Sequence, residues 1–145
     1  MSGGGRSAQQ DREFPYVKGL LRGVEVYRDL IEGQPTVIMG DFNSNAIWNR
    51  KRAGAQDHGA LVTRLDELGL VSAYHDFHDE AHGAETRPTL YFLRKESRPY
   101  HIDYCFIPKT WASHVRAVDV GSYAEWTGAS DHRPVVVDLE EPGNA

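Results

Sequence analysis

The sequence has little cysteine and no long apolar run. Cys105 is the only cysteine among 145 residues, so an intramolecular disulfide is excluded. It lies in an apolar segment, which favours a buried, unreactive thiol over a reactive one. No apolar stretch approaches the roughly 20 residues that cross a bilayer, and the first residues lack the apolar segment of a secretory signal. We therefore expect a soluble, cytoplasmic protein with no membrane contact.

Positive charge is also scarce. Sixteen Lys and Arg residues stand against 21 Asp and Glu residues, which gives a formal net charge of -5 at pH 7. This balance argues against a protein that grips long nucleic acid through many phosphate contacts. Two local basic groups remain, at residues 50–52 and 94–98. Such groups are more often solvated surface than a track for phosphates, although a local basic rim stays open.

What is present suits one globular α/β domain. The chain is 40% hydrophobic and 26% charged, and it is long enough to bury a sizeable core. Residues 1–12 are rich in Gly, Ser and Gln, so we expect them to be disordered, as we do the tail 141–145. Between them we expect a single domain over residues 13–140, because no linker or internal repeat divides it.

Hydrophobic periodicity predicts alternating helices and strands. Helical spacing of apolar residues predicts amphipathic helices over 15–32 and 57–68, the second capped by Asp57. The apolar run 35–39 predicts the most clearly buried strand of the chain. Further strands are expected over 89–93, 100–106, 115–120 and 135–139, and short helices over 44–48 and 108–112. A helix followed closely by a strand is typical of a layered α/β domain.

The segment Gly40-Asp41-Phe42-Asn43 follows the run 35–39 directly. Gly40 permits a close backbone approach, and Asp41 and Asn43 supply polar groups at the end of a strand, where functional residues often lie. Because Gly, Asp and Asn are also the commonest turn residues, this segment alone leaves an ordinary turn open.

Residues 75–82 contain three histidines and three acidic residues. This composition suggests a metal site, but the spacing matches no standard metal-binding motif. A polar loop is the favoured interpretation.

The predicted strand 100–106 places an acidic residue among apolar ones. Period-two geometry puts Tyr104 on one face with its apolar neighbours, and Asp103 on the other. A carboxylate at such a position needs a partner. Pro134 favours an extended backbone before it, so Asp131 and His132 point to opposite sides. We therefore expect Asp103 to pair with His132 and fix its tautomer, which leaves Asp131 free to hold a divalent cation or its water.

Three motifs occur in order along the chain: Gly40-Asp41-Phe42-Asn43, His101-Ile102-Asp103-Tyr104 and Ser130-Asp131-His132-Arg133-Pro134. Together they resemble the C-terminal half of the endonuclease/exonuclease/phosphatase (DNase I-like) superfamily, over about residues 15–140. The resemblance implies half of a layered β-sandwich, with a mostly antiparallel or mixed sheet and helices packed on one face. It also implies metal-assisted hydrolysis of a phosphate ester. Nuclease activity is favoured, and the substrate is nucleic acid or a small phosphate ester.

The resemblance also implies a role for each site residue. Asp41 would position or deprotonate the attacking water and would also contact the metal ion, and Asn43 would hold that water or a phosphate oxygen. His132 would contact the scissile phosphate with Asp103 behind it, and Asp131 would lie in the metal environment. The ion would be Mg²⁺ or Mn²⁺, which prefer oxygen ligands. A structural role is favoured for His101.

The family pattern includes two earlier strands, one ending in Asn and one ending in a Gln-Glu pair, whose Glu is the principal metal ligand. This chain has neither, so we expect a weakly bound ion, an uncovered apolar sheet face, and weak or absent turnover in isolation. Three explanations follow: part of a longer enzyme, a half-domain completed by a second chain or copy, or a non-catalytic module that binds phosphate ligands or proteins. Another alternative is a plain α/β interaction domain without a hydrolase site, in which the site residues would lie far apart.

Overall fold

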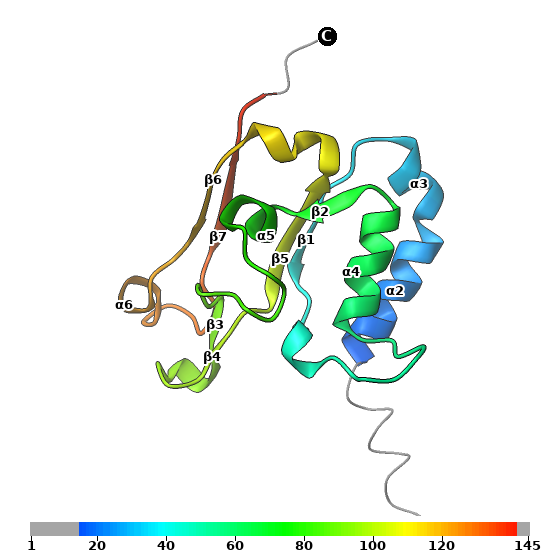
Figure 1. Cartoon of the computed structure of the whole chain (residues 1–145). Coiled ribbons are helices and arrows are strands. Elements are labelled where there is room, and N and C mark those ends of the chain that lie inside the picture. Colours follow the sequence, from blue (N-terminus) through cyan, green and yellow to red (C-terminus); the bar gives the residue numbers. More distant parts are fainter. Residues whose placement is uncertain (1–14, 142–145) are drawn as a thin grey trace, which may run out of the picture.

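The computed structural model describes residues 15–141. Its middle layer is a three-stranded antiparallel sheet in the order β1-β5-β2, built from β1 (Ile38–Asp41), β5 (Asp103–Pro108) and β2 (Leu70–Ser72). Figure 1 shows helices on one side of this sheet and the β6/β7 pair on the other. Of the segments expected to be disordered, residues 1–12 and 142–145 lie outside the described residues.

Two helices, α2 (Pro15–Val26) and α4 (His58–Glu67), cover one face of the sheet. Their buried residues form the first core cluster with two aromatic residues of β5, namely Val17, Val24, Leu61, Leu65, Tyr104 and Phe106. Asp57 caps α4 as predicted, because its Oδ1 accepts a hydrogen bond from the Ala60 amide at 3.0 Å. The predicted helix 15–32 is interrupted at Tyr27, and α3 (Arg28–Gly33) follows the break.

The opposite face packs on α5 (Ala73–His78) and on an antiparallel pair, β6 (Val115–Val120) and β7 (Val135–Leu139). Ala73, Tyr74, Ile107 and Val118 form this second core cluster. The predicted alternation of β5 is confirmed, since Tyr104 and Phe106 face the helices whereas Cys105 and Ile107 face this cluster. Cys105 is half-buried, and burial raises the pKa of its thiol, as suits an unreactive cysteine.

The prediction that the strand before Gly40 is the most buried one was wrong. Met39 is 73% exposed and Val37 is 42% exposed. The reason is that β1 lies at the edge of the sheet and only the face carrying Ile38 is covered by helices. The buried central strand is β5, in which Phe106 is 1% and Ile107 0% exposed. The uncovered apolar face of β1 is the feature expected of half a sandwich.

The remaining elements connect these layers. They are the 3-10 helices η1 (Ala46–Trp48), η2 (Phe92–Arg94) and η3 (Lys109–His114), the short antiparallel strands β3 (Leu90–Tyr91) and β4 (Pro99–Tyr100), and α6 (Tyr123–Trp126). The predicted strand 100–106 is thus divided. Its start pairs with β3, and its later part pairs with β1 and β2. In the described part of the chain, no helix has the length and apolar character needed to cross a membrane.

Candidate functional site

The site lies where the end of β1 meets the start of β5. The antiparallel register places Asp41 directly opposite Asp103. Phe42 fixes the turn after β1, because it is only 3% exposed and its ring stacks on Phe106 at a centroid distance of 5.8 Å. Asp41 Oδ1 accepts a hydrogen bond from the backbone amide of Asn43 at 2.8 Å. Two carboxylates on opposite strands repel each other, so this pair costs stability unless a cation or a proton lies between them.

His132 contacts both carboxylates. Its Nδ1 lies 3.0 Å from Asp103 Oδ2, and its Nε2 lies 3.7 Å from Asp41 Oδ2. The backbone around His132 is held by β3, because the Tyr91 amide donates to the Asp131 carbonyl at 2.8 Å and a bridge pairs Leu90 with His132. The pairing of His132 with Asp103, expected from the sequence, is present.

The three side chains are partly shielded from solvent. The exposed fraction is 17% for the Asp103 side chain, 35% for Asp41 and 36% for His132. Burial raises the pKa of Asp103, and the nearby Asp41 charge acts in the same direction, while hydrogen bonds from Thr89 and His132 act against both. A perturbed carboxylate in an accessible site is typical of functional centres.

One group of residues between 15 and 141 could hold a metal ion. Asp41, Asp103 and His132 each offer a ligand atom, and these atoms lie within 4.8 Å of one another. Two carboxylates fit Mg²⁺ or Mn²⁺, which proteins usually bind through one or two carboxylates together with substrate phosphate oxygens. Asp131 is not in this group. Asn43 is exposed beside it, on the rim of an adjoining pocket.

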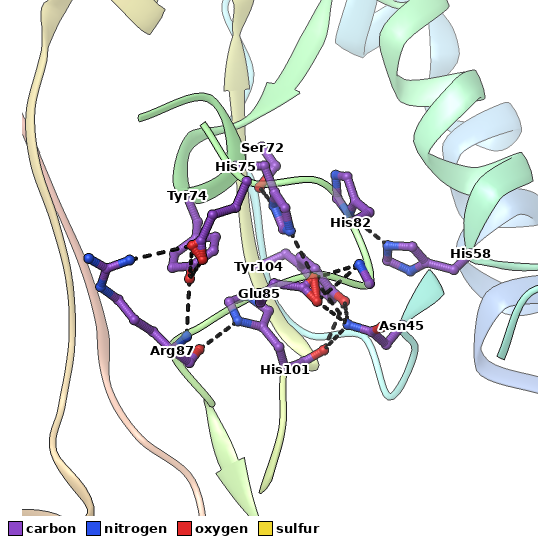
Figure 2. A network of polar contacts seen from close by, with 12 residues as sticks. Asn45, His58, Ser72, Tyr74, His75, His82, Glu85, Arg87, His101 and Tyr104 are labelled. Carbon is purple, nitrogen blue, oxygen red and sulfur yellow. Dashed lines mark hydrogen bonds and ion pairs between the residues drawn. The ribbon is translucent and has the colours of Figure 1, made fainter. Parts of the chain in front are cut away.

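Behind this site lies a histidine network that the sequence did not predict (Figure 2). The polar loop expected over 75–82 begins only after His78, because residues 75–78 belong to α5, and His75 is only 7% exposed. His75 stacks on His82 with ring centroids 3.6 Å apart, and His82 Nδ1 lies 3.0 Å from His58 Nε2. His101, which is 5% exposed, completes the group and has the structural position favoured for it.

Glu85 and Asn45 connect this network to the site. Glu85 Oε2 lies 3.1 Å from His75 Nε2, and Glu85 Oε1 accepts a hydrogen bond from Asn45 Nδ2 at 2.9 Å. The same amide nitrogen donates to the His101 carbonyl at 2.7 Å. Asn45 thereby ties the turn that follows Asp41 to the segment that leads into Asp103. The network fixes the two loops that carry the site.

Burial determines the charge state of this network. Desolvation lowers the pKa of His58 to about 4 and that of His82 to about 3, and the charge of His75 acts in the same direction on both. Burial also disfavours the Glu85 carboxylate, but hydrogen bonds from His75, Asn45 and the Gly83 amide outweigh it and bring its pKa to about 2. At neutral pH the network therefore holds one carboxylate, with His58 and His82 both neutral.

Comparison with protein-family models identifies the family of the chain. The family model described as the Endonuclease/Exonuclease/phosphatase family matches residues 15–132. No curated protein matches the chain. The superfamily is of nuclease and phosphatase type and typically depends on divalent metal ions, which suits the two carboxylates and the imidazole. Because the match spans most of the 145 residues, the chain belongs to the endonuclease/exonuclease/phosphatase family.

Proposed function

We propose that the chain carries the site of a metal-dependent phosphoric ester hydrolase, with a phosphodiester of nucleic acid as the favoured substrate. The observation that supports this proposal is the position of His132 between Asp103 at 3.0 Å and Asp41 at 3.7 Å. Residues far apart in sequence converge here, and their side chains are the types that phosphate hydrolysis uses: acids, an imidazole and a nearby amide.

The hydrogen bonds assign the proton positions. A carboxylate only accepts, so His132 Nδ1 donates to Asp103, and the other ring nitrogen, Nε2, lies on the side of Asp41. Nε2 is then the atom that contacts the scissile phosphate, and Asp103 orients the ring. Asp41 accepts the proton of the attacking water, and the Asn43 side chain holds that water or a phosphate oxygen.

A divalent ion would be held by Asp41 and Asp103, with Asp131 as a candidate for its water shell. When bound, the ion would stabilise the charge that develops on the phosphoryl oxygens. The cluster within residues 15–141 offers only two carboxylates, so we propose weak binding of Mg²⁺ or Mn²⁺ by these residues alone.

The test is hydrolysis of a single-stranded oligonucleotide and of a phosphomonoester by the pure chain, with Mg²⁺ or with EDTA. We expect slow, Mg²⁺-dependent release of product that His132→Ala abolishes. His114→Ala is the matched control, because His114 ends η3, outside the Asp41, Asp103 and His132 group. Turnover that survives His132→Ala, or that EDTA does not affect, would contradict the proposal.

The uncovered face of β1 favours a second candidate, a half-domain completed by another chain or a second copy. Met39 and Val37 are 73% and 42% exposed, and isolated chains rarely leave adjoining apolar residues uncovered. Under this candidate, the chain alone binds phosphate ligands without turnover. Sedimentation of the wild type and of Met39→Lys tests it, since a second copy on this face gives a dimer that the substitution disrupts. A monomer with full turnover would exclude this candidate.

A further inference from the structure

A pocket adjoins the site on the side of Asn43. It has a volume of about 270 Å³ and is lined by Asn43, Trp48, Leu90, Phe92, Tyr100 and Ile102. Asn43 therefore belongs both to the turn that carries Asp41 and to the wall of this pocket. The volume is near the lower end, about 300 Å³, of pockets that bind small molecules. It suits one ring system beside the phosphate site, and is too small for a longer stretch of a ligand.

The lining consists mainly of aromatic and aliphatic faces. Trp48 stacks on Tyr100 with ring centroids 5.6 Å apart and planes 28° apart. Trp48 is 40% exposed and Phe92 is 45% exposed, so both rings present area to a ligand. Asn43 is the one amide side chain that lines the pocket, and the Tyr100 hydroxyl and the Trp48 ring nitrogen are the other side-chain polar groups. A polyhydroxylated ligand such as a sugar phosphate would find few hydrogen-bond partners here, whereas a flat aromatic base would find stacking partners.

Positive charge is concentrated in the two chain segments that follow the aromatic residues Trp48 and Phe92 of the pocket. Lys51 and Arg52 follow Trp48 closely in the chain, and Arg94, Lys95 and Arg98 follow Phe92. All five side chains are exposed, and the Arg98 guanidinium lies 5.9 Å from the centre of the Phe92 ring. In a chain of net charge -5, this is a local concentration of cations, offset within these two segments only by Glu96. Aromatic rings together with cations are the combination by which proteins bind single-stranded nucleic acid.

From these observations we infer that the pocket between Trp48 and Phe92 binds one unpaired nucleobase of a substrate whose phosphodiester lies at Asp41, Asp103 and His132. The base stacks on the exposed rings, Asn43 lies between the base and the scissile phosphate, and the basic segments meet the neighbouring phosphates. This inference rests on the proposed function and narrows its substrate to nucleotide chemistry. It separates such substrates from inositol phosphates and sugar phosphates, which have no aromatic face.

The experiment compares the binding of two ligands that differ only in their bases. A thymidine dinucleotide and its abasic analogue are titrated in EDTA, so that no hydrolysis is needed, and binding is followed by calorimetry. We expect the wild type to bind the dinucleotide roughly tenfold more tightly than the abasic analogue. Trp48→Ala and Phe92→Ala should each remove most of this preference. Leu93→Ala is the matched control, because Leu93 is 60% exposed in the same turn but does not line the pocket.

Equal binding of both ligands by the wild type, or a preference that survives both substitutions, would overturn the inference. A competition arm tests whether the base is unpaired: a single-stranded oligonucleotide should compete at least tenfold better than its duplex, and equal competition contradicts the inference. The result of this binding experiment is distinguishable from the result of the hydrolysis test of the proposed function. A base preference without hydrolysis leaves the pocket assigned and the hydrolase wrong, whereas hydrolysis without a base preference does the reverse.

Discussion

His132 and the buried histidine network show what environment does to one side chain. His132 is partly exposed, has a carboxylate on each side, and lies where a ligand can reach it. His58 is buried and His82 is partly buried, both among other rings, and desolvation lowers the pKa of both. The first environment suits proton and phosphate chemistry. The second disfavours protonation of His58 and His82, so these two serve as neutral hydrogen-bonding groups.

The two regions are nonetheless connected. Asn45 donates to Glu85 in the network and to the carbonyl of His101, two residues before Asp103. Tyr104, which follows Asp103, donates to the carbonyl of Ser44 at 2.7 Å. The buried network thus holds together the two segments from which Asp41 and Asp103 project. Substitutions in the exposed site should therefore change activity, and substitutions in the network should change stability.

The largest effect is expected at Asp103. Asp103→Asn replaces the acceptor of His132 Nδ1 by an amide that can donate, which favours the wrong tautomer. We expect kcat/KM for phosphate ester hydrolysis to fall by at least about 100-fold. The melting temperature should hardly change, because burial already raises the pKa of Asp103 and so disfavours its charge. Asp138→Asn, on the exposed face of β7, is the control. An unchanged rate would mean that Asp103 does not orient His132.

The largest effect on stability is expected from substitution of Glu85. Its side chain is 4% exposed, and Glu85→Ala leaves His75 Nε2 and Asn45 Nδ2 without this acceptor. We expect the free energy of unfolding to fall by about 3 kcal/mol, measured by urea denaturation. Glu96→Ala, at an exposed position, should change it by less than about 0.5 kcal/mol. If both variants behave alike, the network does not hold the loops.

Local sequence signals predicted much of the fold. The cap at Asp57, the apolar stripe of α4 and the alternation along β5 depend on neighbours a few residues apart, and all were predicted. The burial of β1 could not be obtained this way. An apolar run such as 35–39 has the same pattern whether its strand is central or at an edge. The burial of β1 depends on its neighbours in the sheet, and β1 pairs only with β5.

The site and the network also differ in how far local sequence signals predicted them. The expected pairing of Asp103 with His132 followed from a local argument, because an acid inside a strand needs a partner and Pro134 orients its neighbours. The network was missed because nothing in the local pattern marked Asn45, His58 or Glu85 as polar groups that need a buried partner. The spacing of residues 75–82 excluded a standard metal motif but carried no sign of burial.

A smaller effect is expected from acid. The histidine pKa is about 6.5 when unfolded and about 4 for His58 and 3 for His82 when folded, so the unfolded state binds more protons below pH 6.5. The two neutral histidines contribute fully to the free energy of unfolding above pH 6.5, and this contribution is lost progressively as the pH falls toward 4. At pH 5 we expect a loss of up to about 2 kcal/mol for each histidine. Urea denaturation from pH 7.5 to 4.5 measures this slope. His82→Leu should make it shallower, whereas His114→Ala should not.

The smallest effect is expected at Ser44, which is 1% exposed and lies 3.0 Å from His58 Nδ1 through its Oγ. This contact and the one between His58 and His82 fit a neutral His58 whose Nδ1 accepts from the Ser44 hydroxyl and whose Nε2 donates to His82 Nδ1. Ser44→Ala removes one neutral hydrogen bond, so we expect the free energy of unfolding to fall by about 1 kcal/mol at pH 7, measured by urea denaturation. Ser113→Ala, at an exposed position of η3, is the control and should change it by less than about 0.5 kcal/mol. An equal loss in both variants would show that the buried hydroxyl of Ser44 contributes nothing through His58.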